Sequence, residues 1–429
     1  MKSLRKYGPV VGVLLATLSA CADENETSPS AGGNTTGATG GSGGTGGSGG
    51  TGGTSGDPDG GITLRPFTRP SAPGKGGVLF SASGESLALT GYPFPAVSAD
   101  DAQIYDGWQI EFDRLLVTLD HIVLSANPDK DSGDQAKTDA VVARVDGPWA
   151  IDLHRDEPTN INGKSAGERA VPIAALTALS NSSPFATDGT RYAFGFDTVA
   201  ATPLAMNVNL DAAGLADYAD MVENTCAVLY VGTATFKGAA ACNTAHQGWP
   251  MSVNFRLCFK TPTTYVNCQN PDNKGTPFPN EESQRGIAFD AHAAVMAQAT
   301  FHTDHPFWDS VLHGSPAHFD QFAARVVGQE GGVPTVTLEH TQGVDYTAYK
   351  DALGGAIQWR YCAEPPTDTH PKLTGPMAFD PQSVPHATGN DPRTGLRDYY
   401  DFATYNQSTQ GHLNADGLCF VRRNYDSPP

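Results

Sequence analysis

The segment from Phe301 to Arg325 holds the densest group of candidate metal ligands in the sequence. It reads FHTDHPFWDSVLHGSPAHFDQFAAR and contains four of the twelve histidines of the chain and three aspartates. A divalent ion such as Zn²⁺ is held by three or four imidazole or carboxylate groups at about 2 Å. The candidate metal ligands in this segment are His302, His305, Asp309, His313 and His318.

The elements expected around this segment would bring its side chains together. A strand, or a bent hairpin, running from Ile287 is expected to end near His302. Pro306 suits the first position of a helix, because its missing N–H would have no partner there anyway. Imidazole and carboxylate ligands without a free thiolate favour Zn²⁺, followed by Cu²⁺ or Ni²⁺.

The second half of the segment is expected to be helical. Asp309 and His313 would then be four residues apart on one helical face. Ser315–Pro316 is typical of a second helix start, which would place His318 in the first turn. One strand end and two helix starts would thus supply the ligands.

Two other interpretations of the same histidines stay open. They could be satisfied by internal hydrogen bonds and serve only the architecture of the protein. They could instead form the centre of a zinc-dependent hydrolase, with Asp309 or Asp320 as the base and one open coordination position.

Three further residues form a second tier of candidates. His121 is in phase with Leu115, Val117 and Leu119 on a predicted strand, so its side chain is expected to point into the core. Asp152 and His154 alternate on one strand face, where a carboxylate can orient an imidazole at a metal site. A satisfied core or surface histidine is the competing interpretation of each.

The acidic run from Asp129 to Asp134 resembles part of a calcium-binding loop. Its glycine comes one position too early for an EF-hand and no glutamate stands at the twelfth position. We therefore expect an exposed acidic turn, with a weak Ca²⁺ site as the alternative.

Alternating apolar residues predict a mainly β fold, a β-sandwich-like body with a few short helices. A helix is expected over 211–224, with Asp211 as its N-cap. In the first half, a strand starting at Gly107-Trp108 is followed by PWAIDLH at 148–154 and RYAFGFDT at 191–198. This order weakly resembles prealbumin-like β-sandwich modules of bacterial lipoproteins. The predicted strands cover 77–81, 112–123, 140–145, 150–154, 191–197, 204–210, 226–236, 251–260 and 287–302.

The cysteines after the N-terminal region number six and are expected to be structural. In an oxidising compartment they would form three disulfides, and no C-x-x-C pair suggests a thiolate metal site. Short loops favour the pairings Cys226–Cys242, Cys258–Cys268 and Cys362–Cys419, although fifteen connectivities exist for six cysteines.

The first 21 residues have the features of a secretory signal. Basic residues precede a short apolar stretch, which is too short for a membrane span of about 20 residues. Leu18-Ser19-Ala20-Cys21 resembles the lipobox of bacterial lipoproteins, and this resemblance implies lipid attachment at Cys21. It also implies an outer-membrane lipoprotein of the cell envelope, periplasmic or surface-facing, with the lipid as its membrane contact.

The chain divides into four segments by composition. Residues 1–20 are the signal peptide, 21–61 are the lipidated cysteine with a disordered, flexible Gly/Thr/Ser tether, 62–210 are the β-rich first half and 211–429 are the disulfide-stapled second half. The tether is similar to those of myxobacterial lipoproteins. A formal net charge of −19 excludes nucleic acid as a partner.

The pattern H-x-D-H followed by an aromatic residue and an aspartate resembles a group of uncharacterised predicted lipoproteins. It is carried here by His302, Asp304, His305, Trp308 and Asp309. The sequence as a whole favours an envelope protein that binds Zn²⁺ or Cu²⁺. The alternative is an interaction lipoprotein without metal that docks an envelope partner or glycan.

Overall fold

The computed structural model describes residues 62–95, 104–155, 170–238, 246–345, 350–357, 362 and 391–425. The predicted signal peptide, Cys21 and the tether lie outside these residues. The described residues belong to one compact unit that starts at Asp57. Strands make up 34% of the described residues and helices 15%, which confirms the mainly β class.

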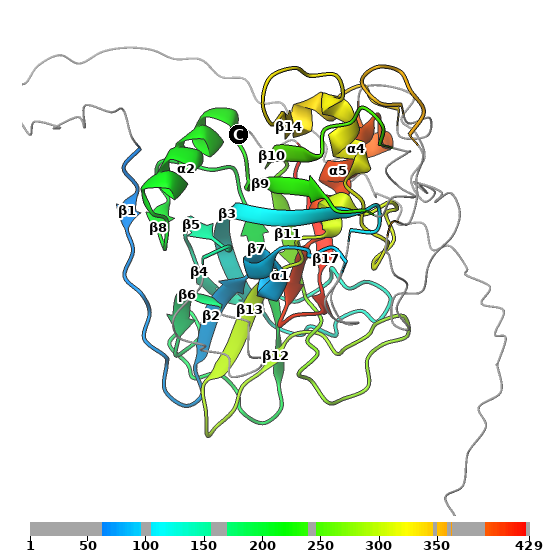
Figure 1. Cartoon of the computed structure of the whole chain (residues 1–429). Coiled ribbons are helices and arrows are strands. Elements are labelled where there is room, and N and C mark those ends of the chain that lie inside the picture. The colour runs from blue at the N-terminus through cyan, green and yellow to red at the C-terminus, as the bar shows by residue number, and fades with distance from the viewer. Residues whose placement is uncertain are drawn as a thin grey trace, which may run out of the picture. The chain divides into compact units, whose positions relative to one another are not determined.

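The larger of the two described sheets has twelve strands and is organised around one long strand, β3 (Figure 1). Strand β3 spans Trp108–Ser125 and pairs with four other strands. The main path runs β1 (Arg65–Pro66), β8 (Met206–Asn207), β5 (Trp149–Asp152), β3, β7 (Arg191–Thr198), β11 (Thr263–Val266) and β17 (Phe420–Arg423). The branches are β4 (Val141–Val145), β9 (Val228–Phe236), β10 (Ser252–Phe259), β12 (Ile287–Ala288) and β14 (Thr335–Thr337).

The smaller described sheet has five strands and packs on the larger one through aromatic side chains. Phe80 stacks on Phe194 with ring centroids 6.1 Å apart, and Phe196 meets Phe301 edge-on at 5.9 Å. These contacts join the two sheets in one core and confirm the sandwich-like body. The strand order is β16 (Gly417–Leu418), β15 (Gly411–Leu413), β13 (Val295–Phe301), β2 (Val78–Ser83) and β6 (Val171–Leu176).

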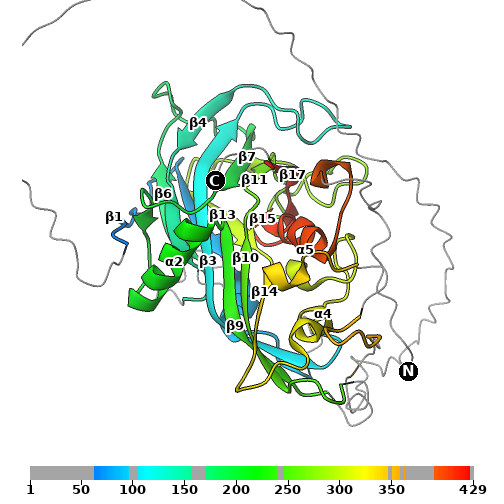
Figure 2. The same ribbon diagram turned by 90° about the horizontal axis from the view of Figure 1, so that it is seen from above.

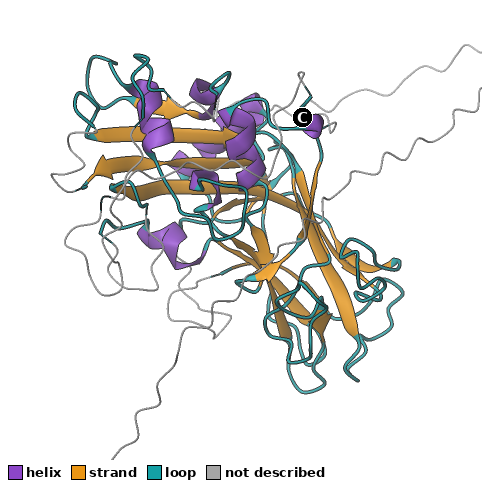
Figure 3. Cartoon of the chain, turned by 90° about the vertical axis from the view of Figure 1, so that its right-hand side faces the viewer, coloured by secondary structure: helices purple, strands orange, loops and turns teal. Residues whose placement is uncertain are grey.

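The helices are short and cover both faces of the β3–β9–β10 region. Figure 2 shows α2 on one side of these strands and α4 and α5 on the other, and Figure 3 shows that the opposite end of the molecule consists of strands and loops. No described helix combines the length and apolar character needed to cross a bilayer. The helices are α1 (Glu85–Thr90), α2 (Ala212–Asn224), α4 (Asp320–Ala323) and α5 (Tyr399–Gln407), with 3₁₀ turns η1 (His305–Phe307), η2 (Ala324–Val326), η3 (Leu338–Thr341) and η4 (Pro392–Thr394).

Helix α2 forms where the sequence predicts it. The Asp211 carboxylate accepts a hydrogen bond from the Gly214 N–H and caps the first turn. The buried side of the helix, including Tyr218 and Met221, packs on Leu116 and Leu229 of the large sheet. The segments 62–210 and 211–429 therefore share one body, and their strands β3 and β9 pair directly.

The predicted strand over 287–302 is divided in two. Strand β12 ends at Ala288 and β13 begins at Val295, because the chain turns at Asp290, whose carboxylate accepts a hydrogen bond from the His292 N–H. The two strands also have different partners, since β12 pairs with β7 and β13 with β2 and β15.

The prediction that His121 points into the core is wrong. Strand β3 contains a bulge between Asp120 and Val123, where its pairing with β7 shifts register. His121 adopts a left-handed backbone there, with φ of 48°, and this breaks the alternation of faces. Its side chain is 38% exposed.

The predicted disulfide pairings are wrong as well. Cys226 is bonded to Cys258, and Cys268 is bonded to Cys419. Each bond lies at the end of a strand pair, β9 with β10 for Cys226–Cys258 and β11 with β17 for Cys268–Cys419. Proximity in the sheet, and not loop length, therefore decides the partner. Cys362 is also disulfide-bonded, and Cys242 lies outside the described residues.

Candidate metal site

Four histidines converge at the end of the small sheet that faces α5. They are His302, His305, His313 and His412, and one nitrogen of each lies within 4.8 Å of one nitrogen of every other. His305 and His412 are fully buried, His302 is 15% exposed at its side chain and His313 is exposed. Ligands about 2 Å from one ion lie about 3 to 4 Å apart, so small adjustments of the rings complete a coordination shell.

Strand pairing positions His302 and His412. In the antiparallel pair of β13 and β15, Thr300 lies opposite His412, and the His302 N–H bonds to the carbonyl of Gln410. His302 and His412 are therefore diagonal neighbours on one face of the sheet. Their rings stack with centroids 4.0 Å apart and planes at 18°.

Glycine 411 allows β15 to lie this close to the core. A Cβ atom at Gly411 would lie 2.4 Å from the ring of Tyr265, which is a severe clash. A residue with a side chain would push β15 away and carry His412 with it.

The 3₁₀ turn η1 and helix α5 position His305. The Thr409 hydroxyl donates its hydrogen to the Asn406 carbonyl at 2.7 Å and lies 2.8 Å from Nδ1 of His305. A hydroxyl that has donated its hydrogen can only accept, so Nδ1 of His305 carries the proton and Nε2 keeps its lone pair. The Trp308 ring packs on His305 at a centroid distance of 3.7 Å and fixes its orientation.

Several buried ring nitrogens of this cluster lack partners. Within the described part of the chain, Nε2 of His305 and both nitrogens of His412 make no hydrogen bond, and Nε2 of His302 has only carboxylates at 3.5 and 4.0 Å near it. An unsatisfied buried polar group costs about 1–3 kcal/mol, so native proteins rarely keep several together without a reason. A divalent ion bound between the four rings would give these unpartnered nitrogens a partner.

The electrostatics favour neutral imidazoles on two of the rings. Burial, and then the neighbouring His412, His302 and His313, lower the pKa of His305 well below its ordinary value. Burial, followed by His302 and His313, likewise lowers the pKa of His412. A neutral imidazole has the free lone pair that a metal requires.

Acidic side chains surround His302. Burial alone would lower its pKa, but Glu85, whose carboxylate lies 3.5 Å from Nε2, acts together with Asp304 and Asp416 to raise the pKa of His302. Asp416 lies 4.0 Å from the same nitrogen. These carboxylates place negative charge beside the four histidines.

The structure leaves two of the predicted ligands, Asp309 and His318, outside the cluster. Residues 308–316 form a loop and not the predicted helix, and α4 begins only at Asp320, so His318 precedes it. Asp309 and His318 are buried and bond to each other, with 3.1 Å between Oδ2 and Nε2. His412, which comes from far along the chain, completes the cluster in their place.

The carboxylates considered as hydrolytic bases are engaged elsewhere. Asp309 bonds to His318, and the buried Asp320 accepts hydrogen bonds from Trp108 Nε1 and His246 Nε2, each at 2.7 Å. Neither residue belongs to the four-histidine group.

The second-tier residues have local roles. The Asp152 carboxylate accepts the backbone N–H groups of Leu115 and His154, and His154 Nδ1 lies 2.7 Å from the Ala88 carbonyl. Asp152 therefore ties strands together and does not orient the His154 ring.

His121 bonds through Nδ1 to Asp197 at 2.8 Å and faces Asp120 with Nε2 at 3.5 Å. With Asp146, Asp120 and His121 form a second group at metal-ligand spacing. In this second group the ligand atoms already have partners within the protein. His121 lies between the carboxylates of Asp120 and Asp197, and Asp146 pairs with Arg144.

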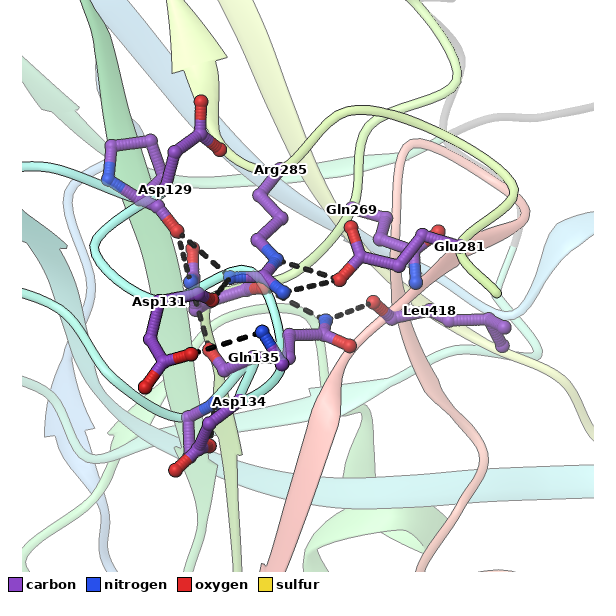
Figure 4. A network of polar contacts seen from close by, with 12 residues as sticks. Asp129, Asp131, Asp134, Gln135, Gln269, Glu281, Arg285 and Leu418 are labelled. Carbon is purple, nitrogen blue, oxygen red and sulfur yellow. Dashed lines mark hydrogen bonds and ion pairs between the residues drawn. The ribbon is translucent and has the colours of Figure 1, made fainter. Parts of the chain in front are cut away.

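The acidic loop at 129–134 is held by cations of the protein (Figure 4). The Arg285 side chain is only 1% exposed; it bonds to Glu281 and donates to the Asp131 carbonyl at 2.7 Å. Arg191 pairs with Asp129, and Lys137 pairs with Asp131. Basic side chains of the protein thus pair with the carboxylates that the alternative, a weak Ca²⁺ site, would use.

No family model, no curated protein and no solved structure matches this chain. The functional argument therefore rests on the chemistry of the four-histidine cluster.

Proposed function

We propose that this protein binds a divalent transition metal, Zn²⁺ or Cu²⁺, through His302, His305, His313 and His412. The observation that carries the proposal is the state of His412, which is buried with no hydrogen-bond partner among the described residues for either ring nitrogen. Three more imidazoles at ligand spacing surround it. Imidazole-only sites suit Zn²⁺, Cu²⁺ and Ni²⁺ and disfavour Mg²⁺ and Ca²⁺, which prefer oxygen ligands.

The support for a metal is stronger than for a purely architectural cluster. A histidine or aspartate with a purely structural role normally has its buried polar atoms hydrogen-bonded, as in the Asp309–His318 and Asp152 contacts. In the cluster, by contrast, the orientation of His305 by Thr409 turns an unpaired lone pair toward the other rings. Metal-binding histidines usually have such a partner on the ring nitrogen that does not bind the metal, and this partner sets the orientation of the ring.

The test is metal content. The full chain, purified oxidised and without a histidine tag, is dialysed against Zn²⁺ or Cu²⁺ and then against metal-free buffer, and the bound metal is measured by elemental mass spectrometry. We expect one ion per chain in the wild type and in the control variant His292→Ala, whose exposed residue lies outside the cluster.

The His412→Ala variant and the double variant His302→Ala/His305→Ala should lose that ion while keeping the circular dichroism spectrum of the wild type. Wild-type protein that retains no metal would refute the proposal.

We further propose that Cys21 carries a lipid that anchors this metal-binding body in the cell envelope. The support is the sequence Leu18-Ser19-Ala20-Cys21 after a short apolar stretch. Cys21→Ser should move the protein from the membrane fraction to the soluble fraction of the host cell, and mass spectrometry of the N-terminal peptide should detect the acyl chains only in the wild type.

A further inference from the structure

The four histidines of the cluster differ in how firmly the fold holds them. His302 and His412 are attached to paired strands, and His305 lies in a buried 3₁₀ turn under Trp308. His313 is exposed and lies in the loop between Trp308 and Ala317, so it belongs to no helix or strand.

The loop that carries His313 is fixed at its base. The bridge between Trp308 and Ala317 closes it, and the Asp309 N–H bonds to the Pro316 carbonyl at 3.0 Å. The Asn406 side chain donates to the Ser310 carbonyl at 3.1 Å, so the end of α5 holds the base of this loop as well as His305. The base therefore keeps His313 within reach of the other three rings.

Hydrogen bonds within the loop close its tip: the Ser315 N–H and hydroxyl donate to the Leu312 carbonyl at 3.2 and 2.6 Å, and the Leu312 N–H donates to the Ser310 hydroxyl at 3.1 Å. The side chains at the tip nevertheless have few neighbours. Leu312 is 65% exposed, and Gly314, in a left-handed conformation with φ of 75°, has no neighbouring atom within 4 Å of the position a Cβ would take. No described residue makes a hydrogen bond to the His313 ring, whose neighbours are the rings of His305, Trp308 and His412. A side chain on such a tip moves at little energetic cost.

We infer that His313 is an exchangeable fourth ligand. The inference rests on the proposed metal site: His302, His305 and His412 hold the ion, and a small nitrogen-donor ligand from solvent can replace the His313 imidazole. One metal–nitrogen bond breaks and another forms, with no electron transferred and no change in metal charge. Three protein ligands with a fourth replaceable position are typical of zinc sites that react, whereas structural zinc sites are closed.

The consequence concerns how the ion enters and leaves. The other three rings are buried or nearly so, so His313 lies on the solvent side of the site. Loading and release then proceed through this side, with His313 dissociating first, and the three inner rings set the affinity.

The test uses Co²⁺ alone as a spectroscopic probe in the full chain. We expect His313→Ala to keep one Co²⁺ per chain, because the three inner rings still hold the ion. The loss of affinity should not exceed roughly 100-fold, the upper end of what the loss of a group outside the ligand set costs. Azide should shift the visible Co²⁺ bands of His313→Ala at a concentration roughly 10-fold or more below that needed for the wild type. In the variant, azide no longer has to displace the His313 imidazole from the metal. Release of Co²⁺ to a chelator should also be faster in this variant.

The matched control is Leu312→Ala, which changes the same tip but no ligand and should behave as the wild type. Loss of all Co²⁺ from His313→Ala would overturn the inference, and so would azide titrations that coincide with those of the wild type. In both cases the proposed function stands, because the wild type still binds metal. Wild-type protein that binds neither Co²⁺ nor Zn²⁺ would overturn the proposed function itself, and this inference with it.

Discussion

The rings of His302 and His412 stack at 4.0 Å, although the two residues belong to segments far apart in the sequence. Strand pairing creates this contact, since β13 and β15 lie side by side with Thr300 opposite His412. Two stacked imidazoles repel each other when both are protonated, because like charges then lie close together. The pair is therefore stable when at least one ring is neutral or when an ion binds the nitrogens.

The Thr409 hydroxyl is predicted to control metal affinity without touching the metal. Thr409→Val keeps the shape of the side chain but removes the acceptor for the His305 Nδ1 proton. We expect metal affinity to fall about 10- to 100-fold, as is usual when a group that orients a metal-binding histidine is removed. Competition with a fluorescent chelator measures the change.

Thr409→Ser retains the hydroxyl and should restore the wild-type affinity. If Thr409→Val and Thr409→Ser bind equally well, the hydroxyl has no role in orienting His305.

The two mapped disulfides should differ in their effect on the site. Cys268–Cys419 spans 151 residues of sequence and ends beside the β15–β16 hairpin that carries His412, whereas Cys226–Cys258 spans 32 residues and lies near α2. Chain-entropy arguments give stabilisation of roughly 5 and 4 kcal/mol, respectively, so each double alanine variant should unfold at lower denaturant concentration.

Metal affinity should weaken only in Cys268→Ala/Cys419→Ala. Isothermal titration with Zn²⁺ on both variants, below their unfolding temperatures, makes the comparison. Equal affinities in the two variants would contradict the role assigned to Cys268–Cys419.

Asp106 is predicted to make stability depend on pH. Burial, and then the adjacent Asp320, raise the pKa of Asp106 well above its ordinary value, although its Oδ2 accepts the N–H groups of Phe319 and Asp320. The folded protein therefore keeps a proton that the unfolded chain releases above its pKa of about 3.9. Since the folded state binds more protons, the free energy of unfolding falls as pH rises from that value toward the folded pKa.

Asp106→Asn supplies a neutral side chain of the same shape and should flatten this pH dependence. Each unit between the folded and unfolded pKa contributes about 1.4 kcal/mol. Urea unfolding of wild type and variant from about pH 5 to pH 8, in the presence of a chelator, measures the slopes. Parallel slopes would show that Asp106 is ionised in the folded state.

Arg285 is predicted to be essential for the stability of the acidic loop. Arg285→Met removes the guanidinium and leaves the largely buried Glu281 without its partner. Loss of one member of a buried ion pair costs about 3–5 kcal/mol. Thermal and denaturant unfolding should show this loss, and the exposed Lys274→Met should change stability by no more than about 0.5 kcal/mol. A small effect of Arg285→Met would mean that water replaces the guanidinium.

Local signals in the sequence were sufficient for the fold class and for several elements. Helix α2 was expected over 211–224 with Asp211 as its cap, and β10 follows from the alternation of Val253, Phe255 and Leu257. The bulge at His121 was not predictable in this way, because it depends on how β3 pairs with β7, which is a relation between distant segments.

The same limit applies to the site. His302, His305 and His313 were found because they are close in sequence, and their density is the signal. His412 stands alone between Gly411 and Leu413, and only the register of β13 with β15 brings it to the cluster. Asp309 and His318 have suitable chemistry for a metal but satisfy each other, which depends on the loop path and not on residue type.

The Cys268–Cys419 bond has a consequence for how the protein responds to proteolysis. All four histidines lie between these two cysteines, so the ligands belong to one covalent ring of chain. A single cut anywhere between residues 269 and 418 opens the ring but leaves the two pieces attached. Even a cut between His313 and His412, which puts the ligands on different pieces, cannot release either half of the site while the disulfide persists.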